Sequence, residues 1–418
     1  MEQTSIEAYT KVISDISRAD QSKTIASNVT INGIFVGNAI TYCGVTTGNL
    51  RDIVTALGGN AKWNRNAGVA TIEIKNKNTG MWEKITYNTK TMINGIGTAS
   101  DGTPFTATDG HLQAGVCHMA QIAGVDDIIS WWIDNGTPTI TIQTDMKNAP
   151  VQVTRAGNDV SINAYLQFTG NAANKLYPGE SAVSSETGLA YSLTYKDVVM
   201  NTIQSKWSGI FNVYGQNLNV NTRAHTKSDN KFQRYLKYKI NFGNEKSSSY
   251  AGKQEDIFIT GIGGDQGVVW NMADSSGRIT VNINQKIILE SWYSNHIKST
   301  FAHEFGHAMG IGDAYNAWYR TTKTMVPRRP VDGKAGYWAP AEYIEQESGN
   351  KWKVQVPDDD IMLGRGTNNV NVVTSNNIRM VLEAYRKNRP VFYPGSSKSF
   401  ADRGNEPVIY YAPYDHLF

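Results

Sequence analysis

Three residues in one short stretch have the types and spacing of a metal-dependent hydrolytic site. The segment FAHEFGHAMGIGDAY, residues 301–315, contains His303, Glu304 and His307. On a helix, residues four positions apart share a face, so the two imidazoles can point at one metal ion. Glu304 lies beside them and is placed to take a proton from a water molecule rather than to bind the metal.

The residues after His307 predict how the site is completed. A catalytic zinc ion takes three protein ligands and keeps one position open. Gly310 can adopt the left-handed conformation that ends a helix and turns the chain back. Asp313 then follows as the third ligand, through a carboxylate oxygen. The pattern predicts one Zn²⁺ site, and the alternative is a buried amphipathic helix with its histidines in the core.

This stretch resembles a known family. HEFGHAMGIGD is similar to the zinc motif H-E-x-x-H-x-x-G-x-x-H/D of the metzincin metallopeptidases, most of which have His where this chain has Asp313. DDDIMLGRG, residues 358–366, resembles the Met-turn of that clan, with Met362 beneath the metal. Many metzincins have a tyrosine where this chain has Gly364, so no tyrosine ligand is expected there. The resemblance implies a zinc endopeptidase over residues 150–418, with a twisted mixed sheet, a zinc helix, a Met-turn and a C-terminal helix.

An internal repeat occupies residues 29–145, within an N-terminal domain predicted over residues 29–146. Each copy contains an apolar strand and turn, a short helix, a Trp-bearing strand, a polar turn and an alternating strand. The helices are expected to end at Gly58 and Gly124. Together with residues 1–28, predicted to be a helical segment, the pattern indicates an α+β multidomain protein with a sheet-and-helix N-terminal domain.

The first copy of the repeat resembles the copper amine oxidase N-terminal-like domain, or stalk domain. The resemblance rests on Leu50, Arg51, Ala56, Leu57, Gly58 and Trp63. It implies a non-catalytic module, which is either a spacer or a module that binds a cell-wall polymer or another surface partner. Oxidase activity is not expected, because the chain lacks the Asn-Tyr-Asp/Glu sequence from which that enzyme's quinone forms.

The cysteines raise a hypothesis about latency. Cys43-Gly44-Val45 resembles the cysteine switch of matrix metallopeptidase pro-segments, in which a thiolate occupies the open zinc position. The flanking Tyr42 and Thr46 differ from the switch pattern. Cys117 is the only other cysteine, so a disulfide is allowed but not required.

The remaining sequence predicts the helices and connecting segments around the site. Residues 147–158 read as a linker, 195–211 as a long helix, 298–309 as the zinc helix and 376–388 as the final helix. Residues 316–357 form a long aromatic excursion, either a wall of the substrate cleft or a small subdomain.

A substrate-binding strand is also expected. In the metzincin clan, the strand at this place is a sheet edge that pairs with extended substrate, which indicates Val268, Val269, Trp270 and Asn271. The alternative is that these residues belong to a core hairpin with residues 278–283, joined by DSSG.

Composition limits the function classes. The net charge is +3 over 418 residues and the cations are dispersed, so nucleic acid is not an expected partner. No apolar run is long enough for a membrane span. No signal peptide is recognised, so an extracellular or exported, bacterial protein is expected with a trimmed leader or another export route.

The expected partner is a protein or peptide substrate. Two alternatives to a general endopeptidase stay open. One is a narrow-target toxin or effector protease, and the other is a non-catalytic surface-binding protein with a vestigial peptidase fold. The sequence leaves calcium (Ca²⁺) sites undecided.

Overall fold

The computed structural model divides into two compact units. The first contains Met1–Asn148, Gln152–Val160 and Arg386–Asn388, and the second contains Ala149–Val151, Ser161–Tyr385 and Arg389–Phe418. The structure describes residues 25–37, 39–42, 45–108, 110–134, 136–242, 259–260, 278–283, 291–311, 315–316, 318–321, 324–327, 339–340, 342–344, 351–353, 360–363, 371–387 and 391.

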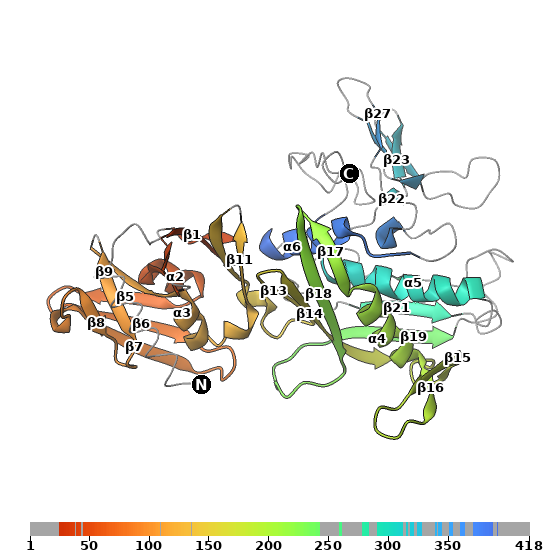
Figure 1. Cartoon of the computed structure of the whole chain (residues 1–418), viewed down its shortest axis with the longest axis horizontal. Coiled ribbons are helices and arrows are strands. Elements are labelled where there is room, and N and C mark those ends of the chain that lie inside the picture. The colour runs from red at the N-terminus through yellow and green to blue at the C-terminus, as the bar shows by residue number, and fades with distance from the viewer. Residues whose placement is uncertain are drawn as a thin grey trace. The chain divides into compact units, whose positions relative to one another are not determined.

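The first unit is mostly sheet (Figure 1). One run of strands has the order β11-β12-β1-β3-β4-β10-β9-β8, and a separate sheet has the order β5-β6-β7. The first run comprises β1 (Ile25–Ile31), β3 (Ala39–Tyr42), β4 (Val45–Asn49), β8 (Ile96–Thr98), β9 (Pro104–Thr108), β10 (His111–Gly115), β11 (Ile129–Asp134) and β12 (Thr137–Ile142). The separate sheet comprises β5 (Asn60–Asn64), β6 (Val69–Lys75) and β7 (Trp82–Asn88).

The two copies of the repeat have the same element order. The first runs β4, α2 (Leu50–Ala56), β5 and β6, and the second runs β10, α3 (Val116–Ile122), β11 and β12. Each copy also contains the tetrapeptide Ile-Asn-Gly-Ile, in which Asn and Gly both have positive φ and the two isoleucines pair. This geometry is that of a type I′ turn, for which Asn-Gly is the preferred sequence. In the first copy the turn joins β1 to β2 (Ile34–Phe35).

Both repeat helices end in the same hydrogen-bonded turn. After α2, Gly58 N–H donates to the Thr55 carbonyl and Gly59 N–H to the Val54 carbonyl, with Gly58 at φ +83°. After α3, Gly124 has φ +66° and makes the equivalent bonds. This is the Schellman motif, which satisfies the last carbonyls of a helix and needs a left-handed residue. The glycines therefore end these helices where the sequence predicts.

The second unit contains a mixed sheet covered by helices, so the α+β class holds for the described chain. β14 (Asp159–Thr169), β19 (Leu236–Phe242) and β21 (Arg278–Ile283) are parallel neighbours, and β20 (Ile259–Thr260) is antiparallel to β21. β18 (Gln216–His225) pairs with β14 and with β17 (Gly209–Val213), and β15 (Leu176–Val183) pairs with β16 (Ala190–Thr194). Helix α4 (Tyr195–Lys206) packs on α5 (Ser291–Ala308), as Figure 1 shows.

Two predictions from the sequence need correction. Residues 147–158 contain a boundary between the two units, but they are not an irregular linker throughout, because Val151–Ala156 forms β13. The helix predicted over residues 195–211 ends at Lys206, and Gly209–Val213 forms β17 against β18. Trp207 is fully buried and Gly209 has φ +147°, a value that a helix does not accommodate.

Two further helices, α5 and α6, correspond to helices predicted from the sequence. Helix α5 begins at Ser291, earlier than the predicted Lys298. The predicted final helix is confirmed as α6 (Ser375–Lys387), with Ile378, Val381, Leu382 and Tyr385 buried.

The aromatic excursion contains short strand pairs, β22 (Tyr315–Asn316) with β25 (Ala339–Pro340), β23 (Trp318–Thr321) with β24 (Thr324–Pro327), and β26 (Glu342–Ile344) with β27 (Lys351–Lys353). Among the described residues, no helix combines the length and apolar composition needed to cross a membrane.

Candidate metal centre

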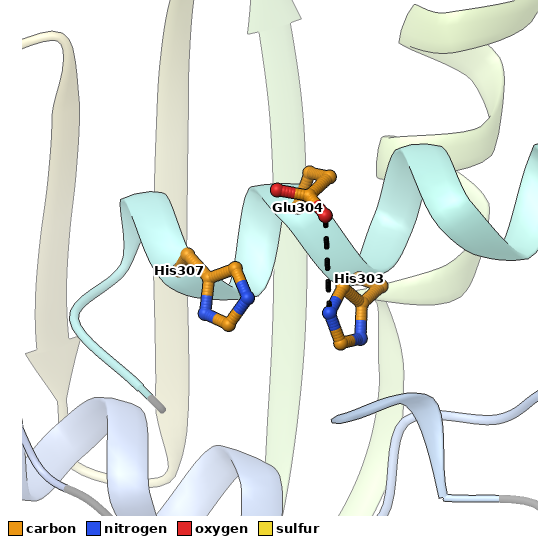
Figure 2. A group of neighbouring side chains, drawn as sticks. All are labelled: His303, Glu304 and His307. Atoms are coloured by element: carbon orange, nitrogen blue, oxygen red, sulfur yellow. Dashed lines mark ion pairs between the residues drawn. The ribbon is translucent and has the colours of Figure 1, made fainter. Parts of the chain in front are cut away.

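One face of α5 holds a buried group that can bind a metal ion. The exposed fractions of His303, Glu304 and His307 are 6%, 4% and 6%, and their ligand atoms all lie within 4.8 Å of one another. Figure 2 shows the two imidazoles side by side on the helix, with the Glu304 carboxylate close to His303. The distance between Glu304 Oε1 and His303 Nε2 is 3.9 Å. The spacing in the sequence brings His303 and His307 together because a helix places residues four apart on one face, and Glu304 is three residues from His307.

Two backbone carbonyls determine which ring nitrogen carries the hydrogen in each imidazole. His303 Nδ1 lies 2.8 Å from the Ile361 carbonyl oxygen, and His307 Nδ1 lies 2.8 Å from the Ile311 carbonyl oxygen. A carbonyl only accepts hydrogen bonds, so Nδ1 carries the hydrogen in each ring. In the neutral imidazole, Nε2 then has the lone pair that a metal requires. Both histidines are therefore prepared to bind a metal through Nε2.

The carbonyl that orients His307 comes from the turn that ends α5. Gly310 has φ +85°, its N–H donates to the His307 carbonyl, and Ile311 N–H donates to the Gly306 carbonyl. This is the same Schellman motif that ends α2 and α3. The turn places the Ile311 carbonyl against the His307 ring, so Gly310 supports the metal centre as well as ending the helix.

The segment predicted to be a Met-turn packs against α5. Ile361–Leu363 forms a single helical turn, and Met362 is fully buried. A Cβ built on Gly306 would lie 2.5 Å from Met362 Sδ, closer than a Cβ atom comes to a non-bonded neighbour in real structures. Glycine at position 306 therefore allows the methionine to approach the helix closely at this position.

A buried carboxylate holds this turn in place. Asp360 is fully buried and accepts hydrogen bonds from Met362 N (2.8 Å), Asn377 Nδ2 (3.1 Å) and Thr374 Oγ1 (3.0 Å). Burial raises the pKa of Asp360 to about 6, against the lowering effect of these hydrogen bonds and of His303. The Ile361 N–H also donates to the Val372 carbonyl. These bonds position the Ile361 carbonyl that orients His303.

The partners of Asp360 belong to the start of α6. Thr374 Oγ1 accepts from Asn377 N, and Asn377 Oδ1 accepts from Thr374 N. This reciprocal arrangement is a capping box, with Thr374 as the N-cap residue and Asn377 at the third helical position (N3). The cap of α6 and the turn at Ile361–Leu363 are therefore one hydrogen-bonded unit.

The sheet and α4 support α5 from its other faces. Trp207 Nε1 donates to the Ala302 carbonyl (2.9 Å), and its ring meets Phe305 edge-to-face. Tyr238 of β19 meets Phe301 edge-to-face and is fully buried. Burial and then the nearby Glu304 charge raise the Tyr238 pKa well above its ordinary value.

The structure describes only part of the predicted site. It brings together His303, Glu304 and His307, places Met362 under the helix, and puts Gly310 at its end. Asp313, the strand residues Val268, Val269, Trp270 and Asn271, and Cys43 lie outside the described residues, as does the segment 1–24. The helical segment predicted over residues 1–28 is wrong at its end, because residues 25–28 belong to strand β1 and pair with β3 and β12. Cys117 is exposed and its thiol is free.

Sequence reasoning missed three supporting residues, which are Gly306, Asp360 and Asn377. Asp360 ends the run DDD directly before the turn at Ile361–Leu363, and Asn377 follows the capping threonine by three positions. The second pattern is a recognisable capping signal, whereas nothing in the sequence distinguishes Asp360 from its two neighbours.

Comparisons with protein families, with curated proteins and with solved structures found no match for this chain.

The contact between Gly306 and Met362 gives a first testable prediction. Gly306→Ala improves helix propensity by about 1 kcal/mol, but overpacking of this kind costs about 1–3 kcal/mol. We expect a net loss of about 1 kcal/mol in unfolding free energy, from urea denaturation. We also expect about tenfold weaker metal binding, because displacing Met362 disturbs the carbonyl that orients His303.

The double variant with Met362→Ala tests the physical cause. If the overlap is responsible, Gly306→Ala should cost less stability in the Met362→Ala background than in the wild type. Equal costs in both backgrounds would show that the two residues do not interact.

Proposed function

We propose that this protein is a zinc-dependent endopeptidase. The observation that carries the proposal is the buried His303–Glu304–His307 group, with both Nδ1 atoms bonded to backbone carbonyls. Catalytic zinc sites commonly use two histidines of one helix with a glutamate beside them as general base. The close contact between Gly306 and Met362 adds support, since it puts the predicted Met-turn residue under the helix.

The donor set fits zinc. Neutral imidazole is a preferred zinc ligand, and hydrogen bonds from the second ring nitrogen to carbonyls are typical of zinc-binding histidines. In the proposed site His303 and His307 hold the ion through Nε2, and the sequence motif supplies Asp313 as third ligand. When bound, zinc lowers the pKa of a water molecule and polarises the scissile carbonyl.

Glu304 performs the proton transfers in this proposal. Its carboxylate accepts a proton from the attacking water and then donates that proton to the leaving nitrogen as the peptide bond breaks. The three side chains are themselves buried, which strengthens electrostatic interactions between them. The carbonyls keep the Nδ1 hydrogens in place, and each imidazole is neutral while its Nε2 lone pair binds the metal.

A peptide library tests the proposed activity directly. Wild-type protein, the same protein after chelation and zinc restoration, and Glu304→Ala are incubated with diverse peptides, and products are read by mass spectrometry. We expect cleavage by the wild type and the zinc-restored protein only, with cut sites that define the substrate preference. Cleavage by Glu304→Ala equal to wild type would refute the proposed role of that residue.

The library also distinguishes the alternatives. Zinc bound at one equivalent without cleavage of any peptide would favour a narrow-target effector protease or a non-catalytic binding protein. Cleavage of many unrelated peptides would exclude both.

Acid is expected to remove the metal and the activity together. A protonated imidazole has no lone pair for a metal, so metal affinity falls as the histidines gain protons. We predict loss of activity as pH falls, with little remaining below about pH 5, because free imidazole has a pKa of about 6.5. Metal content after dialysis at each pH, measured by plasma mass spectrometry, should fall in parallel with the rate. Full activity well below pH 5 would contradict the histidine ligands.

A further inference from the structure

A separate cavity lies in the first unit, and the proposed peptidase chemistry does not use it. Its volume is about 580 Å³, within the range of about 300–1,000 Å³ for small-ligand sites. The lining comes from the start of α2, from β5 and β6, and from the region of β9 and β10. Arg51, Trp63 and His111 line it and are exposed, so the cavity is open to solvent.

Trp63 provides an aromatic surface in this cavity. Its exposed fraction is 47%, high for so large an apolar side chain. In the β5–β6 ladder it lies opposite Ala70, and Ala61 precedes it on the same face of the strand. Both neighbours are alanines that also line the cavity, so they cannot cover the indole ring. A ligand with a flat apolar face would bury surface that the fold leaves in water.

The polar side of the cavity contains a histidine of defined tautomer. Asn49 Oδ1 accepts from Arg51 N at 3.0 Å, and Asn49 Nδ2 lies 3.1 Å from His111 Nδ1. The first bond fixes which atom of the Asn49 amide is oxygen, so the amide nitrogen is the donor in the second. His111 Nδ1 therefore accepts, and its Nε2 carries the hydrogen. The exposed imidazole can offer that N–H to a ligand.

The charged residues that line the cavity limit the class of ligand that it can bind. Arg51 and Lys62 are cations, whereas Asp52 is an anion, so cations outnumber anions by one. Arg51 and His111 donate hydrogen bonds and Asp52 accepts them. A purely apolar ligand would strip water from these groups without replacing it. A small cation would meet an excess of positive charge.

We propose that this cavity binds a short oligosaccharide that carries a carboxylate. The face of a sugar ring is apolar and suits the Trp63 indole, while its hydroxyl groups both donate and accept hydrogen bonds at the rim. The carboxylate complements the extra cation, with Arg51 as its bidentate partner. The inference is independent of the peptidase proposal, because all the residues involved lie in the first unit.

Titration calorimetry on the full chain tests the proposal. The probes are tetragalacturonate, the neutral tetra-N-acetylchitotetraose, and a tetraglutamate peptide that has the charge without the sugar rings. We expect tetragalacturonate to bind with a Kd below about 1 mM and more tightly than the neutral sugar. Trp63→Ala should weaken this binding at least tenfold. Arg51→Ala should weaken the acidic sugar more than the neutral one.

Trp82→Ala is the matched control. Trp82 is 63% exposed in β7 of the same sheet and does not line the cavity, so this variant should bind as the wild type does. Trp63→Tyr keeps an aromatic ring and should retain most of the affinity, and circular dichroism checks that each variant is folded. Equal loss in the Trp63→Ala and Trp82→Ala variants, or binding of neither sugar, would overturn the proposal. Tetraglutamate binding that depends on Trp63 would overturn it in favour of an acidic peptide site.

Discussion

Replacing Glu304 with glutamine is expected to lower kcat/KM for peptide hydrolysis by about 100- to 10,000-fold, the range of a general base. The variant should keep its metal. Glutamine has nearly the same shape and fits the same buried space, but its amide cannot take a proton from water. The measurement is steady-state kinetics on the best library peptide, beside zinc content per chain. The two readouts together separate a loss of proton transfer from a loss of the ion.

His307→Ala is the matched control for this experiment. It removes an imidazole whose ring is held by the Ile311 carbonyl, so it should lose both zinc and rate. Asp313→Ala should behave in the same way if Asp313 is the third ligand. A Glu304→Gln protein without zinc would mean that the carboxylate is itself a ligand. The division of roles within the site would then be wrong.

The sequence was sufficient to predict the parts of this site that depend on local geometry. A helix brings residues four apart onto one face whatever surrounds it, so the positions of His303 and His307 follow from their spacing. A left-handed turn after a helix strongly favours glycine, so Gly310 also has a local signal. The Ile-Asn-Gly-Ile turns of the first unit are predictable for the same reason.

The parts that depend on distant contacts had no such signal. The group that orients His303 is the carbonyl of Ile361, and every residue has a carbonyl, so no side-chain type marks that position. The fit of Met362 against Gly306 joins segments far apart in the chain. The predicted helix over residues 195–211 fails for a related reason. Its apolar pattern continues through Ile210 and Phe211, but strand pairing with β18 determines the structure there.

Asp360→Ala is expected to cause the largest loss of stability among the predicted variants. It leaves the buried Met362 N–H and Asn377 amide, and the partly buried Thr374 hydroxyl, without the carboxylate that accepts their hydrogen bonds. We expect a cost of about 3 kcal/mol in unfolding free energy, because each unsatisfied buried group costs about 1–3 kcal/mol and part of this is relieved by relaxation. Zinc affinity should fall by about 10- to 100-fold, as for other residues that support metal ligands.

Asp360→Asn separates the geometry of this network from its charge. Asparagine keeps an oxygen for Met362 N, and its amide can donate to the Thr374 hydroxyl, so zinc affinity should stay within a few-fold of wild type.

Burial raises the Asp360 pKa above its ordinary value of 3.8 to about 6, so the folded state holds this proton more tightly than the unfolded chain. The resulting stability is present below about pH 4 and is lost as pH rises through about 6.

The Asn variant does not titrate, so its stability should not show that loss. Between pH 4 and pH 7 the wild type should lose up to about 3 kcal/mol relative to Asp360→Asn, at 1.36 kcal/mol for each pKa unit. Urea denaturation of both proteins across this range measures the difference. Parallel pH profiles would show that Asp360 is not the titrating group. A shared loss of zinc in Asp360→Asn and Asp360→Ala would show that the ionised carboxylate itself supports the metal.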